Sequence, residues 1–160
     1  MGQRKGVPLD PDLVRQALAR TRLPGRIEVL SEAPLLVVDG AHNSVAMEVL
    51  LSAVEQGLSY ENLHVLFACS KDKDVKAMIA LLAPAAKRWT FTRFDFPRIE
   101  EPERLQEFLE EVAPGAESRV THSVADALDD TRRRSGSRDC ILCCGSFYLV
   151  GEIFKKIPGI

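Results

Sequence analysis

The stretch Leu35–Asn43, "LLVVDGAHN", places an acid, a glycine, a histidine and an amide soon after four aliphatic residues. These four aliphatic residues lack polar alternation, so they predict a strand buried on both faces, as in a parallel sheet. Gly40 permits a sharp turn, and Asn43 can cap the helix that follows, with Ser44 as the alternative cap. Because ligands of open α/β sheets bind beyond the carboxyl ends of strands, the segment from Asp39 onward is a candidate site.

Strand and helix patterns alternate along the rest of the chain. Hydrophobic patterns and turn residues predict strands at 26–32, 35–39, 63–69, 88–94, 117–121 and 139–144. They predict helices at 11–21, 43–57, 74–83, 102–112, 123–134 and within 145–157. The helix at 43–57 is expected to pack through Val45, Val49, Leu50 and Val54. This rhythm predicts a three-layer, Rossmann-like α/β domain: a six-stranded, mainly parallel sheet with one antiparallel edge strand and helices on both faces.

The composition is that of an ordinary globular domain. A length of 160 residues suits one domain, and 21 basic against 23 acidic residues give no general attraction to nucleic acid. No apolar run is long enough to span a membrane, and residues 1–5 do not begin a signal peptide. We therefore expect a monomeric chain in the cytoplasm, with neither a nucleic acid nor a membrane as partner.

Three of the four cysteines lie in the strand-like run "CILCCG", residues 140–145. Cysteine in such a run acts as a small buried apolar residue, and a Cys-x-x-Cys pair with one distant third cysteine makes a poor zinc site. The sequence therefore predicts buried, reduced thiols and no metal site.

Three polar clusters, "DGAHNS", "SKDKD" and "CGSFYLVG", each follow a predicted strand, so they should meet at one edge of the sheet. Their residue types suit an anion or a metal–phosphate complex. Asp39 can orient a hydroxyl or a magnesium-bound water, His42 can donate to an anion, and Lys71 or Lys73 can add charge. Ser146 begins a helix whose free N–H groups can bind a carboxylate or phosphate. Each cluster also has a structural interpretation, as a turn, a solvated helix start or a helix cap.

Two common nucleotide-binding motifs are missing. The chain has no Gly-x-x-x-x-Gly-Lys-Ser/Thr loop and no Gly-x-Gly-x-x-Gly fingerprint, which argues against a self-sufficient ATPase or a dinucleotide enzyme. His64 falls within a predicted strand and His122 next to a predicted helix, so both are interpreted as structural.

Four segments carry a resemblance to a known family: "LPGRIEV", "PLLVVDGAHNSVAMEVL", "KDKD" and "GSFYLVGEI". In this order and spacing they resemble the C-terminal domain of the folylpolyglutamate synthase/dihydrofolate synthase family, which belongs to the Mur ligase superfamily of ATP-dependent ligases. The resemblance covers about residues 23–157 and departs at Ser44, where the family usually has Pro, and at Cys144, where it usually has Thr. It implies a helical lead-in at 1–22 and a glutamate-ligase domain at 23–160.

The resemblance also implies a reaction and roles for residues. The family activates the carboxylate of folate or dihydropteroate as an acyl phosphate, which the amine of L-glutamate then attacks. ATP and Mg²⁺ would be bound mainly by a central ATPase domain that these 160 residues lack, so the chain alone is expected to be inactive. Arg26 matches a catalytic arginine that reaches the ATP phosphates, and Asp39 a residue near the nucleotide. His42, in a catalytic role, and Ser146 match residues that position glutamate. Further possible site residues are Asn43, Lys71, Asp72, Lys73 and Tyr148.

Two other classes of function stay open at this point. One is a freestanding, non-catalytic module that keeps the fold and binds a small acid or another protein. The other is a phosphoacceptor domain of the flavodoxin-like type, which would need clustered acids after the first strand and a lysine after the last. The run "CCGS" supplies no such lysine, and the retained Arg26, Asp39, His42 and Ser146 favour the ligase domain.

Overall fold

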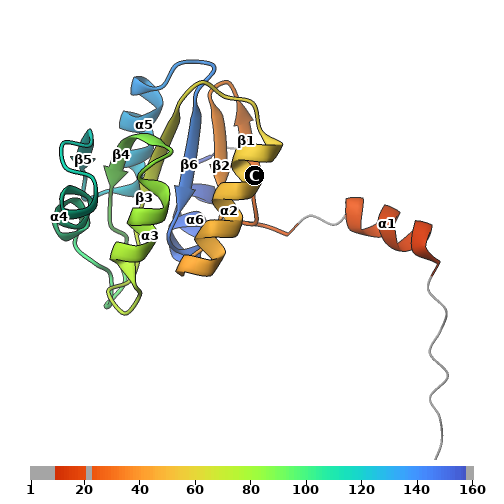
Figure 1. The fold of residues 1–160 in the computed structure, drawn as a ribbon, viewed down its shortest axis with the longest axis horizontal. Coiled ribbons are helices and arrows are strands. Elements are labelled where there is room, and N and C mark those ends of the chain that lie inside the picture. Colours follow the sequence, from red (N-terminus) through yellow and green to blue (C-terminus); the bar gives the residue numbers. More distant parts are fainter. Residues whose placement is uncertain (1–9, 21–22, 158–160) are drawn as a thin grey trace, which may run out of the picture.

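The computed structural model describes residues 10–20 and 23–157, and Figure 1 shows a single sheet between two layers of helices. The strands are β1 (Glu28–Glu32), β2 (Leu35–Val38), β3 (Leu63–Phe67), β4 (Ala86–Phe91), β5 (Ser118–Val120) and β6 (Cys140–Cys144). Their order across the sheet is β1-β2-β6-β3-β4-β5. The β1–β2 pair is antiparallel and the other neighbouring pairs are parallel. The predicted fold class is confirmed.

Helices cover both faces of the sheet. They are α1 (Pro11–Arg20), α2 (Ser44–Gly57), α3 (Val75–Leu82), α4 (Pro102–Val112), α5 (Val124–Arg134) and α6 (Phe147–Phe154). One core cluster joins the sheet to α2, α3 and α4, and a second joins its other face to α5 and α6. Figure 1 shows α1 standing apart from both layers. Across the described ranges, no helix combines the length and apolar character that crossing a bilayer requires.

Strand β2 contributes side chains to both core clusters. Leu36 and Val38 pack into the cluster on the α5–α6 face, and Val37 packs into the cluster on the α2–α4 face. Successive side chains of a strand point to opposite faces, and all three are fully buried. This explains why the segment is apolar throughout, and why it ends in a polar cluster only where the sheet ends.

The first strand begins later than predicted. It starts at Glu28 rather than at Arg26, because Gly25 and Ile27 both adopt positive φ angles, of 69° and 44°. These two residues form a turn in front of the strand. The pattern of alternating side chains extends across this turn, which is why it was interpreted as strand.

The fourth strand ends three residues earlier than predicted, at Phe91. The neighbouring β3 ends at Phe67, so the chain beyond Phe91 has no strand to bond along its length. It turns instead, with the Ile99 N–H donating to the Phe96 carbonyl at 3.0 Å. Ile99 then pairs with Ser70, which follows β3. The other predicted boundaries of strands and helices lie close to those observed.

The buried face of α2 also differs from the prediction. Val45 and Val49 are exposed, at 74% and 63% of their surface, whereas Leu50 and Val54 are buried as expected. Met47, which lies three residues before Leu50, completes the buried face. A helix buries residues spaced by three or four, so Met47, Leu50 and Val54 form one stripe and the two exposed valines lie beside it.

The cysteines are free thiols, and all four are buried. Burial raises the pKa of Cys140 to about 12 and raises those of Cys143 and Cys144 well above the ordinary range. All three lie in β6, in the middle of the sheet. The interpretation of "CILCCG" as a buried strand is confirmed.

We expect Cys140, Cys143 and Cys144 to resist thiol reagents until denaturant is added. The thiolate is the reactive form, and buried thiols with raised pKa values supply little of it. Labelling followed by mass spectrometry measures this, with Ser137→Cys, on an exposed turn, as a control that should react at once. Rapid labelling of all three cysteines in the native protein would contradict the buried strand.

Candidate functional site

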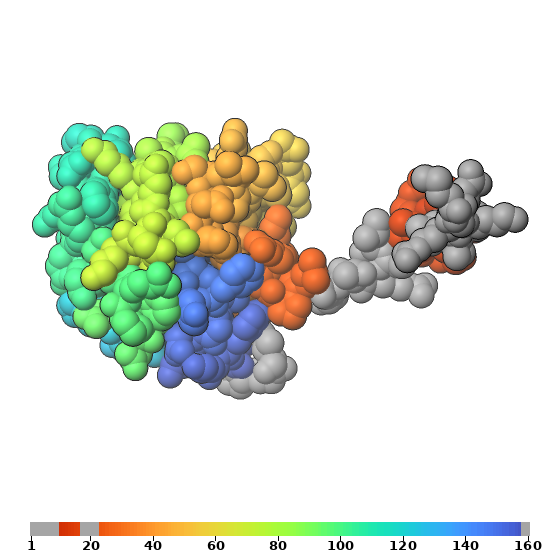
Figure 2. Space-filling view, turned by 90° about the horizontal axis from the view of Figure 1, so that it is seen from below, coloured from red at the N-terminus to blue at the C-terminus, as the bar shows by residue number. Residues whose placement is uncertain are grey.

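Three loops meet at the carboxyl edge of the sheet, and backbone hydrogen bonds join them. The Gly40 N–H donates to the Gly25 carbonyl at 2.8 Å, and the Gly145 N–H donates to the Ala41 carbonyl at 2.9 Å. Figure 2 looks onto this edge, where the blue α6 lies between the red-orange segment near residue 25 and the yellow-green and green segments after β3 and β4. Two of the three predicted polar clusters, "DGAHNS" and "CGSFYLVG", are therefore joined at this edge.

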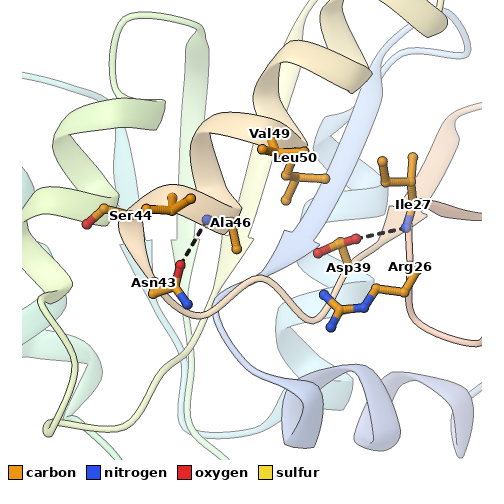
Figure 3. Close-up of a pocket in the computed structure, with 9 residues that line it drawn as sticks. Arg26, Ile27, Asp39, Asn43, Ser44, Ala46, Val49 and Leu50 are labelled. Carbon is orange, nitrogen blue, oxygen red and sulfur yellow. Dashed lines mark hydrogen bonds between the residues drawn. The ribbon is translucent and has the colours of Figure 1, made fainter. Parts of the chain in front are cut away.

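Asp39 holds the turn before β1. It is buried, and one of its carboxylate oxygens accepts the Ala41 N–H at 2.6 Å. The other accepts the Ile27 N–H at 2.9 Å, as Figure 3 shows. A positive φ is unusual for a β-branched residue such as Ile27 and persists only where its surroundings enforce it. The hydrogen bond from the Ile27 N–H to the Asp39 carboxylate stabilises this conformation. The structural interpretation of Asp39 as a turn residue is thus correct, and the turn it holds carries Arg26.

Arg26 projects from this turn over an aromatic ring. Its guanidinium carbon lies 4.5 Å from the centre of the Phe147 ring, within the range of a cation–π contact. The same ring packs on the backbone of Gly40, where an added Cβ would lie 2.3 Å from a ring carbon. Phe147 therefore links all three loops. The sequence pattern did not single out Phe147, although it lies within the run "GSFYLVG".

A first cavity, of about 720 Å³, opens beside Arg26 and Asp39. Its polar wall also includes Asn43, whose side chain accepts from the Ala46 N–H at 2.8 Å and caps α2, as predicted. Its apolar wall is formed by α2 residues and Ile27, including the exposed valines of α2 (Figure 3). The cavity offers one cation, one carboxylate and an apolar surface, which suits a molecule with an anionic part and a flat apolar part.

A second, smaller cavity of about 200 Å³ contains most of the remaining predicted site residues. Among them are His42 and Ser146. The Nδ1 of His42 lies 2.9 Å from the Gly40 carbonyl oxygen, and because a carbonyl only accepts, Nδ1 must donate. This leaves Nε2 as the nitrogen for a ligand. Ser146 is mostly buried and caps α6, since its hydroxyl accepts the Tyr148 N–H at 3.1 Å.

The "SKDKD" cluster contributes Asp72 and Lys73 to this second cavity. A carboxylate oxygen of Asp72 lies 3.6 Å from the Lys73 ammonium and 3.8 Å from the Arg98 guanidinium. A hydrogen bond from Ser70 and these two cations keep the pKa of Asp72 below its ordinary value. Lys71 lines neither of the two cavities, and its N–H donates to the Arg98 carbonyl at 2.9 Å. Of the two candidate lysines, Lys73 lines the second cavity and Lys71 does not.

The loop between β4 and α4 supplies residues that the sequence analysis did not single out. Arg98 and Phe96 both line the second cavity, and the Phe96 ring stacks on that of Tyr148 with centres 4.7 Å apart. Tyr148, which was a possible site residue, lines the same cavity. Residues 92–94 of this loop were predicted to continue the strand, so its approach to α6 was not visible in the pattern.

No metal centre is evident in the part of the chain that the structure describes. Among these residues, no group of three or more His, Cys, Asp or Glu side chains is placed to hold an ion. His64, interpreted as structural, is indeed buried in β3 and bonded to Asp139 at 2.9 Å. His122, exposed and 3.2 Å from Glu103, lies next to α5, outside both cavities. The predicted absence of a metal site stays a prediction.

We expect Gly40→Ala to destabilise the domain by about 1–3 kcal/mol, the usual cost of overpacking, because its Cβ would collide with the Phe147 ring. Urea unfolding measures this. Gly151→Ala in α6 is the matched control, since a Cβ there meets no atom within 4 Å. In a Phe147→Ala background the cost of Gly40→Ala should largely vanish. An equal cost in both backgrounds would show that the ring and Gly40 are not coupled.

Comparison with known proteins agrees with this geometry. The sequence profile of the family described as "Mur ligase, glutamate ligase domain" matches residues 25–147, more than half of the chain. The chain belongs to this family. The matched range of the glutamate ligase domain begins at the Gly25 turn and ends at Phe147, so it includes Arg26, Asp39, His42 and Ser146.

The relatives of this glutamate ligase domain are longer proteins. A folylpolyglutamate synthase of Lacticaseibacillus casei is 40% identical over 152 residues, which are 95% of this chain and 34% of the relative. The structure of E. coli FolC in complex with DHPP and ADP superposes with a TM-score of 0.85 at 27% identity, covering 94% of this chain and 35% of that one. A Yersinia pestis bifunctional folylpolyglutamate synthase/dihydrofolate synthase, complexed with AMPPNP and Mn ion, gives 0.81 at 27% identity with the same coverage. The chain thus spans about a third of each.

Proposed function

We propose that this chain is the C-terminal domain of an ATP-dependent ligase that adds L-glutamate to folate or dihydropteroate. The observation that carries the proposal is the junction of the three loops, which sets Arg26 above one cavity and His42 and Ser146 in the next. The names of the relatives support the same activity. In this proposal residues 1–22 are a lead-in, residues 23–160 form the glutamate-ligase domain, and an N-terminal ATPase domain of the same enzyme supplies the phosphate-binding loop.

The first cavity is assigned to the nucleotide side of the reaction. Arg26 lies on a turn fixed by Asp39 and by a hydrogen bond from the Gly25 N–H to Glu28 at 2.8 Å, so its charge is delivered from a rigid support. A cation held in this way stabilises the charge on a phosphoryl group in transfer without reorganising. Asp39 contributes chiefly by holding this turn, and it also forms part of the wall of the first cavity.

The second cavity is assigned to L-glutamate. The Nε2 of His42 and the hydroxyl of Ser146 are hydrogen-bonding groups that can hold the amino acid while its amine attacks the acyl phosphate. Lys73 adds a positive charge in the same cavity. Phe147 lines this cavity and also packs under Arg26. Its ring therefore contacts both the residue assigned to phosphoryl transfer and the cavity assigned to glutamate.

Mg²⁺ does not fit the residues described here. It prefers several oxygen ligands in an octahedral arrangement, and the described chain has no such group. Asp39 already accepts two N–H groups. We therefore place the metal with the ATPase domain. We also place the enzyme in the cytoplasm, because its four buried cysteines are free thiols, as in proteins of reducing compartments. We further propose that it is a monomer.

The experiment is ATP-dependent incorporation of radiolabelled L-glutamate by the full-length enzyme that contains this chain, with folate and dihydropteroate as alternative acceptors. We expect incorporation that requires ATP and an acceptor, and none from the 160-residue chain alone. A full-length protein that binds glutamate but neither consumes ATP nor ligates would instead fit a non-catalytic binding module. Turnover by the isolated chain, above that of its Arg26→Ala variant, would contradict the division of the site between two domains.

A further inference from the structure

We propose that Arg98 recognises a carboxylate of L-glutamate in the second cavity and so selects a dicarboxylic amino acid over its amide. This inference rests on the proposed function, from which the amino acid is taken. It concerns a residue that lies far in sequence from the "DGAHN" and "CCGS" loops and that the fold brings into the same cavity.

The backbone of Arg98 is fixed to the loop that carries Lys73. Its carbonyl accepts the Lys71 N–H at 2.9 Å, and the next residue, Ile99, pairs with Ser70. The Glu100 N–H donates to the Cys69 carbonyl, also at 2.9 Å. These contacts bond the chain before α4 to the chain after β3 over several residues. Arg98 and Lys73 therefore come from one bonded unit, and both residues line the second cavity.

Aromatic stacking also packs this loop, which lies between β4 and α4, against α6. The Arg98 guanidinium carbon lies 5.5 Å from the centre of the Phe96 ring. Phe96 stacks on Tyr148, and Tyr148 also stacks on Phe94 at 5.9 Å. Tyr148 and Ser146 both lie at the start of α6 and line the same cavity as Arg98. Stacking on a ring also orients the flat guanidinium while leaving its N–H groups available.

The cations of this cavity are only partly neutralised. Asp72 is the acidic residue that lines the cavity beside them. Its carboxylate oxygen lies 3.6 Å from the Lys73 ammonium and 3.8 Å from the Arg98 guanidinium, and both distances exceed that of a hydrogen bond. Two positive charges face one negative charge, so an incoming carboxylate meets a net attraction. It can also make the shorter, charge-assisted bonds that Asp72 does not make.

The size and chemistry of the cavity suit an acidic amino acid. At about 200 Å³ it is smaller than the cavities that hold drug-sized ligands. His42 and Ser146 provide hydrogen-bonding groups for one part of the molecule, and Arg98 and Lys73 provide charge for a carboxylate. Glutamine has nearly the shape of glutamate but lacks the second carboxylate. The difference between them therefore isolates the contribution of the side-chain carboxylate, and the Arg98→Gln variant separates the share of Arg98 from that of Lys73.

The test is titration of the ¹⁵N-labelled 160-residue chain with L-glutamate and with L-glutamine, followed by NMR. We expect glutamate to shift amides of residues 70–73, 96–99 and 145–148, and glutamine to bind about tenfold more weakly, the value of one charge-assisted hydrogen bond. Arg98→Gln should weaken the affinity for glutamate about tenfold and leave the affinity for glutamine unchanged. Arg93→Gln is the matched control, because Arg93 pairs with Glu101 and lines neither cavity.

An Arg98→Gln spectrum that matches the wild type away from the cavity shows that the variant is folded. The inference is overturned if that variant keeps the preference for glutamate, or if the chain binds no glutamate at these residues. The two proposals fail separately. Ligation by the full-length enzyme without an Arg98-dependent preference removes only this inference, whereas Arg98-dependent binding without any ligation removes only the proposed ligase activity.

Discussion

Arg26→Ala in the full-length ligase should lower kcat by about 10²–10³-fold, which corresponds to about 3–4 kcal/mol of transition-state stabilisation. The guanidinium is held over the Phe147 ring, 4.5 Å from its centre, at the edge of the first cavity. Its charge matters most while the phosphoryl group is transferred, so the KM for glutamate should change little. Steady-state kinetics with ATP and glutamate varied in turn measure both parameters.

Folding should survive this change, because the Arg26 side chain is exposed and belongs to neither core cluster. Circular dichroism and urea unfolding of the variant test that point. Arg133→Ala is the matched control, since Arg133 is exposed at the end of α5 and outside both cavities. Equal kinetics for Arg26→Ala and Arg133→Ala would mean that the Arg26 turn has no catalytic role.

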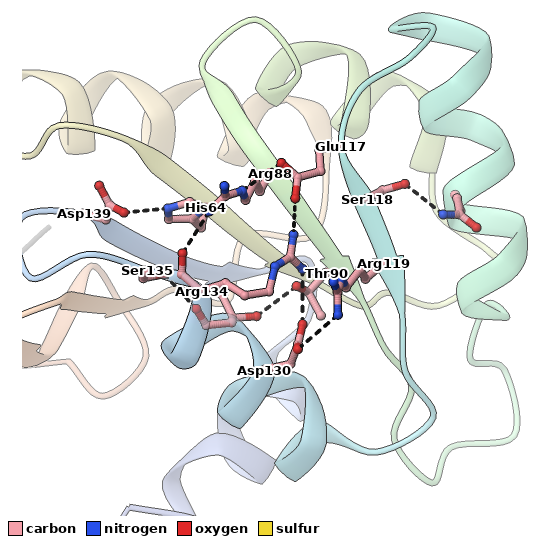
Figure 4. Close-up of polar contacts among 12 residues, drawn as sticks. His64, Arg88, Thr90, Glu117, Ser118, Arg119, Asp130, Arg134, Ser135 and Asp139 are labelled. Atoms are coloured by element: carbon pink, nitrogen blue, oxygen red, sulfur yellow. Dashed lines mark hydrogen bonds and ion pairs between the residues drawn. The ribbon is translucent and has the colours of Figure 1, made fainter.

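Asp139→Ala should destabilise the domain by about 3 kcal/mol, the cost of removing one partner from a buried, charge-assisted network. Asp139 lies just before β6 and is 6% exposed. Its carboxylate accepts from the Asn62 amide at 2.7 Å, from His64 Nε2 at 2.9 Å and from the Gly136 N–H at 2.8 Å. Figure 4 shows it bonded to His64, which lies on β3. Without the carboxylate, the buried His64 and the two part-buried donors lose their partner.

The contribution of Asp139 to stability should depend on pH. Burial acts to raise its pKa, but the hydrogen bonds from His64, Asn62 and Gly136 outweigh burial and lower it from 3.8 to about 2. A carboxyl group with a lowered folded-state pKa stabilises the fold above its unfolded-state pKa and loses that effect as the pH falls through the folded-state value. The difference between wild type and Asp139→Ala should therefore be full above about pH 4 and shrink toward pH 2.

Urea unfolding at several pH values measures this difference. Asp129→Ala, an exposed position on α5, is the control and should change the free energy of unfolding by less than about 0.5 kcal/mol. A loss for Asp139→Ala no greater than for the control would show that the network contributes nothing. A difference that stays constant down to pH 2 would show that the carboxylate charge is not its source.

The sequence was most informative where a continuous apolar run indicates that a strand is buried. The apolar runs at β2, β3 and β6 predicted the central strands because each is buried on both faces. It was least informative where a contact joins distant segments. Val45 and Val49 have the same chemistry as buried valines, and only the packing of α2 shows that they border a cavity.

The candidate site shows the same division. Asp39, His42 and Ser146 stand directly after strands or at helix starts, so their place at the sheet edge could be predicted from topology. Phe147 and Arg98 could not, because the role of each depends on a contact across loops: the ring with Gly40, and the arginine carbonyl with Lys71. Local pattern has no signal for such contacts.

The most direct test of the divided site is the kinetics of His42→Ala in the full-length ligase. Its Nδ1 donates to the Gly40 carbonyl at 2.9 Å, so Nε2 is assigned to glutamate. We predict that the KM for L-glutamate rises about tenfold, the value of one lost hydrogen bond, while kcat and the KM for ATP change little. Unchanged circular dichroism controls for folding. A variant with wild-type kinetics, or one that loses kcat at an unchanged KM for glutamate, would contradict the assignment of the second cavity to glutamate.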